Sequence, residues 1–214
     1  MDERNSQYRL ESARSGCMVP VINDVYLHSI YNPEKEAITF AQKYESSLKI
    51  KSSVLVLGLG FGYHIEEISK MVTSFHKDSK IFVLEPNQRL VDDFINSKSF
   101  TNKNIKIICN SSAKELFTSL DFVSFLMNKP CIIKHDSSFV VNKEFYASVL
   151  SYKAPTDVYN LNKVFNSDAK YIFENSDATS IDNTVEHLKQ NGLKSKNDFL
   201  LMAFNEIRTT KTQR

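Results

Sequence analysis

Residues 53–64 read SVLVLGLGFGYH, and the fold of the chain follows from this stretch. The apolar run Val54–Leu57 has the length of a strand that is buried on both faces. Three of the chain's five glycines follow it, at positions 58, 60 and 62, and an amphipathic pattern comes next. We therefore expect a strand, a tight glycine turn and a helix N-terminus, an arrangement in which backbone N–H groups can approach a nucleotide closely.

Further apolar runs of strand length alternate with amphipathic segments along the chain. We expect strands at 81–84, 105–109 and 131–134, and helices at 33–46, after position 87, at 112–120 and at 143–150. The alternation predicts an α/β fold with right-handed crossovers. The expected architecture is a Rossmann-like, methyltransferase-like, mostly parallel sheet with flanking helices and a helical C-terminal tail.

Three regions are expected in the chain. Residues 1–18 are polar and predict a flexible N-terminus, and residues 19–155 form the Rossmann-like domain with an N-terminal helical extension. Strand signals end after Pro155, so residues 156–214 are expected to form a helical tail. Its helices should span 157–175, 180–191 and 196–208, with Gly192 as the C-terminal cap of the second.

Composition excludes several classes of protein. The net charge is +2 without a basic stripe, so nucleic acid is not an expected partner. No apolar run approaches the ~18 residues of a membrane helix, and no signal peptide is visible. Three widely spaced cysteines fit reduced thiols and predict a cytoplasmic protein. Neither a CxxC pair nor a Cys/His cluster is present in the sequence, so no metal site is expected.

The glycine turn carries the candidate ligand site. Its pattern, G-x-G-x-G, resembles motif I of class I S-adenosylmethionine-dependent methyltransferases, which makes that compound a candidate cofactor. Gly58, Gly60 and Gly62 would shape the turn, and Tyr63 and His64 follow it. The remaining candidates stand at the ends of the next two strands. They are Glu85, where such sites hold a ribose, and Asn110, which could bond a base edge.

Other features of the sequence leave the chemistry of this site open. The acidic residue that those methyltransferases place two positions before the first glycine is Val56 here, and a catalytic signature is missing, so the catalytic residues are unknown. The three glycines could also serve backbone geometry alone, with Glu85 capping the next helix. His135 and Asp136 could act as an acid/base pair or form a plain polar loop.

Four segments together resemble a known family. HSIYNPEKEA at 28–37, GLGFGYH at 58–64, Glu85-Pro86 and the stretch 132–150 are similar to the amino-terminal Rossmann-like domain of motility accessory factor proteins. Members of that family are glycosyltransferases that place nonulosonic acids on flagellin. The transferase activity is assigned to a domain that follows the Rossmann-like one. The resemblance covers about residues 28–150 and implies the fold and the pathway.

Two functional hypotheses follow from these observations. The first is an accessory module of the flagellin-glycosylation type that lacks transferase activity of its own. Its partners would be flagellin or a glycosylation enzyme, and a nucleotide-type small molecule could bind at the turn. The second is a divergent S-adenosylmethionine-dependent methyltransferase. A third possibility is a nucleotide-sugar site that is kept for regulation.

Overall fold

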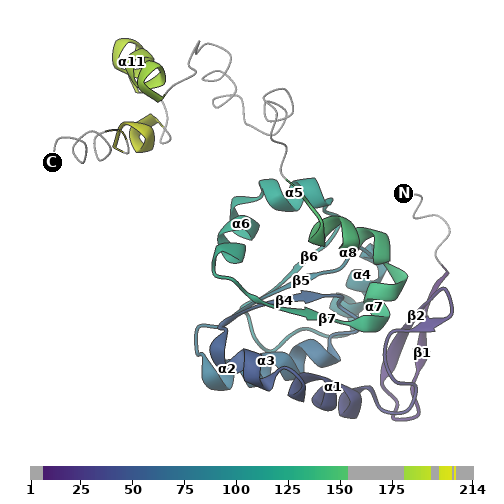
Figure 1. Cartoon of the computed structure of the whole chain (residues 1–214). Coiled ribbons are helices and arrows are strands. Elements are labelled where there is room, and N and C mark those ends of the chain that lie inside the picture. Colours follow the sequence, from purple (N-terminus) through teal and green to yellow (C-terminus); the bar gives the residue numbers. More distant parts are fainter. Residues whose placement is uncertain (1–6, 154–180, 194–197, 204, 206–214) are drawn as a thin grey trace. The chain divides into compact units, whose positions relative to one another are not determined.

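The computed structural model describes residues 7–153, 181–193, 198–203 and 205. The chain divides into two compact units, residues 1–152 and 153–214, which are taken separately below. In the first unit a four-stranded parallel sheet has the order β6-β5-β4-β7 (Figure 1). Its strands are β4 (Ser53–Leu57), β5 (Lys80–Leu84), β6 (Ile105–Ile108) and β7 (Cys131–Lys134).

The strand order explains the apolar run that the sequence places before the glycines. β4 lies between β5 and β7, with Leu57 aligned to Leu84 on one side and to Lys134 on the other. All five residues of β4 are buried, as a strand covered on both faces requires. β5 and then β6 lie on one side of β4. The chain then crosses back, and β7 pairs with the other side of β4.

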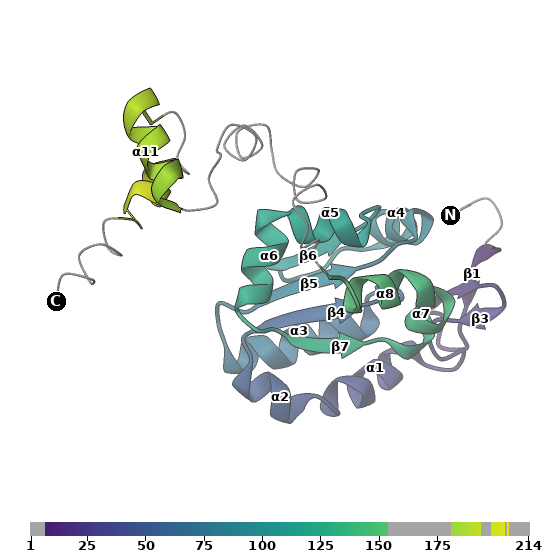
Figure 2. The ribbon, with the colours of Figure 1, turned by 45° about the horizontal axis from the view of Figure 1, so that its top comes forward.

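Helices cover both faces of this sheet (Figures 1 and 2). One face packs against α1 (Pro33–Gln42), α2 (Glu45–Ile50), α3 (Tyr63–Phe75) and α4 (Gln88–Ser97). The other face packs against α5 (Ala113–Thr118), α6 (Leu120–Met127) and α8 (Lys143–Leu150). Alternate residues of β4 serve the two apolar cores: Val54 and Val56 face the first, and Leu55 and Leu57 face the second. The predicted α/β fold is therefore confirmed.

A three-stranded antiparallel sheet precedes the first helix. It contains β1 (Tyr8–Ser12), β2 (Met18–Ile22) and β3 (Val25–Tyr26), in the order β1-β2-β3. The Tyr63 hydroxyl donates a hydrogen bond to the Met18 carbonyl over 2.9 Å, which ties this small sheet to the start of α3. Residues 8–12, assigned by the sequence to a flexible N-terminus, thus form a paired strand because β2 supplies their hydrogen-bond partners.

Two expected helices end earlier than the sequence predicts, and each is followed by a further helix. The helix expected at 33–46 ends at Gln42, and α2 starts at Glu45 after a short turn. The helix expected at 112–120 is α5, which ends at Thr118, and α6 is a further helix that the sequence analysis did not foresee. α6 starts after Ser119, whose side chain accepts from the Phe122 N–H. A short helix that the sequence analysis did not foresee, α7 (Asp136–Val141), follows β7 directly.

The second unit is described over short stretches only. α11 (Ile181–Asn191) agrees with the helix expected at 180–191, and Gly192 has the positive φ of +79° that a C-terminal cap needs. Residues 198–203 are helical, as expected, while the helix expected at 157–175 lies outside the described residues. Across the described residues, each helix is too short or too polar to cross a lipid bilayer.

Candidate functional site

The glycine turn leaves β4 and enters α3 through three residues with positive φ. The φ angles are +109° at Gly58, +54° at Gly60 and +81° at Gly62, a backbone region that side chains other than glycine rarely adopt. The chain's own side chains fill the space above these glycines. A Cβ atom would lie 2.3 Å from Ser138 Cβ at position 58 and 2.4 Å from His28 Nε2 at position 60. The turn is therefore built for close internal packing.

Backbone N–H groups of the turn also have partners within the chain. The Leu59 N–H donates to Glu85 Oε2 over 2.9 Å, and the Phe61 N–H donates to His28 Nε2 over 3.1 Å. The Gly58 and Gly62 N–H groups donate to backbone carbonyls. In this conformation three N–H groups of the turn, those of Gly58, Leu59 and Phe61, hold it on β5, on Glu85 after β5 and on His28, and the Gly62 N–H closes the turn on Leu59.

Glu85 is fully buried at the end of β5 and contacts the turn rather than an open site. Its carboxylate accepts from the N–H groups of Leu59 and Asn87. Burial raises the pKa of Glu85 to about 7, while these two hydrogen bonds act in the opposite direction. Asn110 is exposed at the end of β6, where its amide donates to Gln88 Oε1.

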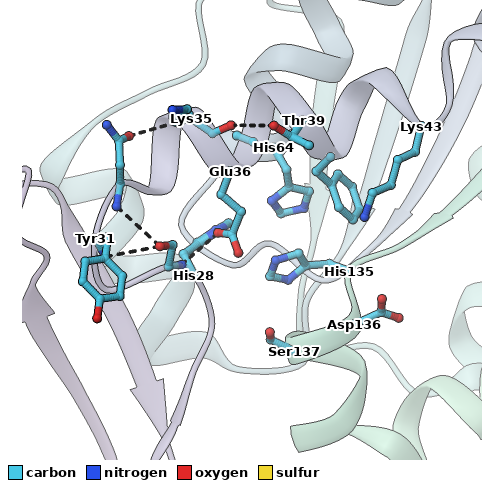
Figure 3. A pocket seen from close by; sticks show the side chains of 14 residues that line it. His28, Tyr31, Lys35, Glu36, Thr39, Lys43, His64, His135, Asp136 and Ser137 are labelled. Atoms are coloured by element: carbon cyan, nitrogen blue, oxygen red, sulfur yellow. Dashed lines mark hydrogen bonds and ion pairs between the residues drawn. The ribbon is translucent and has the colours of Figure 1, made fainter.

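A pocket of about 490 Å³ opens beside the turn, and we call it the histidine pocket. It lies between α1, the first turn of α3 and the start of α7, with the three histidine side chains pointing into it (Figure 3). The residues that line it include His28, Tyr31, Lys35, Glu36, Phe40, Lys43, His64, His135, Asp136 and Ser137. Of the residues predicted to bind a ligand, His64 lines this pocket, as do His135 and Asp136, which the sequence offered as an acid/base pair.

The other predicted residues are distributed elsewhere. Gly62 and Tyr63 line a second pocket of about 470 Å³ on the other side of α1, next to Lys98. The Lys98 ammonium lies 3.5 Å from the centre of the Tyr63 ring. Burial lowers the pKa of Lys98 to about 8. Gly58, Gly60, Glu85 and Asn110 line neither of these two pockets.

The three histidines form a compact cluster in the histidine pocket. The rings of His64 and His135 are stacked, with centroids 4.2 Å apart and planes within 7°. The His28 ring lies 4.8 Å from the His135 ring and 5.4 Å from the His64 ring. All three side chains are at least 94% buried. Burial lowers the pKa of each below the usual value of histidine, so the rings are neutral at pH 7.

α1 positions the carboxylate of this pocket. Its N-terminus is set by Asn32, whose side chain accepts from the Lys35 N–H, and by Pro33 at the first helical position. One turn later, Glu36 Oε2 accepts from the Ser29 N–H over 2.8 Å and lies 3.3 Å from His28 Nδ1. The segment 28–37 therefore folds into one unit that carries His28 and Glu36 to the glycine turn.

Sequence reasoning missed His28 and Glu36 as site residues. Both belong to the segment 28–37, which was noted for a resemblance and not for its chemistry, although it contains a histidine and a carboxylate. The sequence shows no Cys/His cluster because the three histidines are separated by 36 and 71 residues, from 28 to 64 and from 64 to 135. The fold brings them together, so the expectation of no metal site overlooked this group.

The strand order and the glycine turn define the class of protein. A parallel sheet of order β6-β5-β4-β7, with a glycine turn between its first strand and first crossover helix, is a Rossmann-like fold. No protein-family model and no curated protein matches the chain. The motility accessory factor family expected from the sequence is therefore not supported by these comparisons.

Among solved structures, the chain is similar to the crystal structure of MNMC2 from Aquifex aeolicus. The sequence identity is 12%, the alignment covers 79% of each chain, and the TM-score is 0.37. A likeness of this size carries no argument about activity. The class assigned above depends on the strand order and the turn of this chain itself.

Proposed function

We propose that this chain is a divergent S-adenosylmethionine-dependent methyltransferase that binds its nucleotide-type ligand in the histidine pocket. The position of the pocket is the observation that carries the proposal. Open α/β sheets bind ligands outside the carboxyl ends of their strands, at the point where the strand order reverses. Here that point lies between β4 and β7, and the pocket is lined by His64 after β4 and by His135 and Asp136 after β7.

The chemistry of the lining agrees with such a ligand. A volume of about 490 Å³ is within the range of small-molecule sites. Tyr31 is 57% exposed at the pocket and offers an aromatic face for a purine. Lys35, Lys43 and Asp136 supply charges of both signs, as the ammonium and carboxylate groups of S-adenosylmethionine require. A methyl transfer depends mainly on positioning, so the missing catalytic signature is compatible with the proposal.

Calorimetric titration with S-adenosylmethionine and S-adenosylhomocysteine tests this proposal. We expect binding of both compounds, and a loss of affinity of roughly 5- to 150-fold in Tyr31→Ala, because base–aromatic stacking contributes about 1–3 kcal/mol. Tyr26→Ala is the matched control, since Tyr26 is a partly exposed tyrosine outside the pocket. A wild-type chain that binds neither compound would rule the methyltransferase out.

A second candidate function is the accessory module of the flagellin-glycosylation type. The observation that favours it is the closed glycine turn, in which His28, Ser138 and Glu85 occupy the positions that a cofactor would need. In such a module the turn is architecture, and the partner is flagellin or a glycosylation enzyme. Binding of CMP-sialic acid without S-adenosylmethionine in the same titration, or binding of purified flagellin, would favour this module over the methyltransferase.

A further inference from the structure

Three imidazole rings from distant parts of the chain converge in the histidine pocket. One ring nitrogen of each lies within 4.8 Å of a ring nitrogen of both others, and the three side chains are buried (Figure 3). Burying a polar nitrogen without a partner costs free energy, so the burial of three imidazole rings in one place calls for an explanation. The hydrogen-bond partners of the ring nitrogens indicate what the cluster can bind.

Each histidine uses one ring nitrogen to fix its orientation. His28 Nδ1 donates to the Glu36 carboxylate, and His64 Nε2 donates to the Gly58 carbonyl over 3.2 Å. Because these two partners only accept, the proton of each ring is assigned to that nitrogen. His135 Nδ1 lies 2.7 Å from Ser138 Oγ. Metal-binding histidines are held in this same way, with the second nitrogen on a carboxylate, a carbonyl or another polar group.

The opposite nitrogens carry the lone pairs. His64 Nδ1 is buried and has no hydrogen-bond partner among the described residues. His28 Nε2 accepts from the Phe61 N–H. Ser138 Oγ can accept as well as donate, so His135 can carry its proton on Nδ1 and leave the lone pair of Nε2 free. Three neutral imidazoles that aim lone pairs into one buried space form a donor set suited to zinc and similar ions.

We propose that His28, His64 and His135 together bind a divalent transition-metal ion, with Zn²⁺ as the first to test. Glu36 is a positioning residue in this site, since it holds the His28 ring through Nδ1. The fourth position faces the pocket, where water or a ligand would complete a tetrahedral ion. This inference does not depend on the proposed methyltransferase activity.

The geometry of the glycine turn is consistent with such a site. A Cβ at position 60 would lie 2.4 Å from His28 Nε2 and 3.1 Å from His135 Cε1, so glycine here lets these two rings approach. Tetrahedral ligands at ~2.0–2.1 Å are roughly 3.4 Å apart. The nitrogens therefore need to close by roughly 1.5 Å at most from their 4.8 Å limit, and the ion would replace the Phe61 N–H at His28 Nε2.

Equilibrium dialysis of the full-length chain against Zn²⁺, after removal of metal with a chelator, tests the site. We expect one ion per chain in the wild type and at least a tenfold weaker affinity in His64→Gln. Glu36→Gln should weaken binding by about 10–100-fold, the usual effect of losing a group that orients a ligand. Titration with Co²⁺ gives an independent readout, because nitrogen ligation in a tetrahedral site produces characteristic visible absorption.

His76→Gln is the matched control. His76 is a partly buried histidine at the end of α3 whose Nε2 lies 3.1 Å from the Leu48 carbonyl, outside the cluster. This variant should bind Zn²⁺ like the wild type. Should His64→Gln fail to fold, the Co²⁺ spectrum of the wild type decides. A wild type that binds no ion, or a binding affinity that His76→Gln lowers as much as His64→Gln, would overturn the proposal and leave a purely structural cluster.

Discussion

At the scale of single residues, Gly60 connects the turn to the histidines. Its φ of +54° disfavours any side chain, and its missing Cβ leaves room for the His28 ring, which Glu36 and the Phe61 N–H hold in place. Gly16 has a similar positive φ of +84°, but a Cβ there would meet no atom within 4 Å. Comparing substitutions at Gly16 and Gly60 therefore separates the cost of backbone strain from the cost of steric overlap.

We expect Gly16→Ala to lower the free energy of unfolding by about 1–2 kcal/mol, the cost of a left-handed residue. Gly60→Ala should cost roughly 1–3 kcal/mol more, because the new methyl group displaces a buried ring. Chemical denaturation followed by circular dichroism measures both. Equal losses in the two variants would show that the His28 ring moves aside freely.

Glu85 makes a second residue-scale prediction, on pH. Its pKa is raised from 4.5 to about 7 in the folded chain, so the folded state binds more protons than the unfolded state between these values. The resulting stabilisation is complete below pH 4.5 and is lost as the pH rises through about 7. The Glu85→Gln variant has no titratable group at position 85. The free energy of unfolding of the wild type should therefore fall relative to that of this variant from pH 5 to pH 8. Denaturation curves at the two pH values measure this difference, and a constant difference contradicts the prediction.

At the scale of elements, α1 is the helix that organises the pocket. Asn32 caps it, and Glu36 in its first turn reaches back to Ser29 and His28. We expect Asn32→Ala to lower the free energy of unfolding by about 0.5–2 kcal/mol, because the Lys35 N–H loses its acceptor. Asn32→Asp keeps an acceptor and is the control. Thermal unfolding of the three chains measures the effect, and an alanine variant as stable as the aspartate variant would argue against the cap.

At the scale of the whole molecule, the two apolar cores lie entirely within the first unit. Their buried members run from Ile22 to Val149, and the contact boundary falls at residues 152 and 153. We propose that residues 1–152, which contain β1 and nearly all of the Rossmann-like domain expected at 19–155, are an independent folding unit. A chain shortened to residues 1–152 should then unfold in one cooperative transition, at nearly the temperature of the full chain. Calorimetry measures this, and a fragment without a transition would show that the remaining residues are required.

The sequence alone determined the fold class and the main elements around the glycine turn. Periodicity identified all four parallel strands, since a doubly covered sheet needs continuous apolar runs, and glycine spacing located the turn at 58–62. The helix starts expected at 33, after 87 and at 112 lie within one residue of the observed starts, where Asn32, Asn87 and Ser112 act as N-terminal caps through neighbouring residues alone. β1 and α6 were missed: β1 depends on its pairing partner β2, and α6 starts from a single serine cap.

Only the tertiary structure decided what surrounds the turn. Glu85 and Gly60, which their spacing makes candidates for nucleotide binding, contact Leu59 and His28 in this structure, because the chain returns from β3 and from β5 to the same point. His28, His64 and His135 meet because the strand order brings the ends of β4 and β7 side by side and α1 packs beside them. The spacing of residues along the sequence does not predict such a contact, because the distances between strand ends depend on the order of the strands in the sheet.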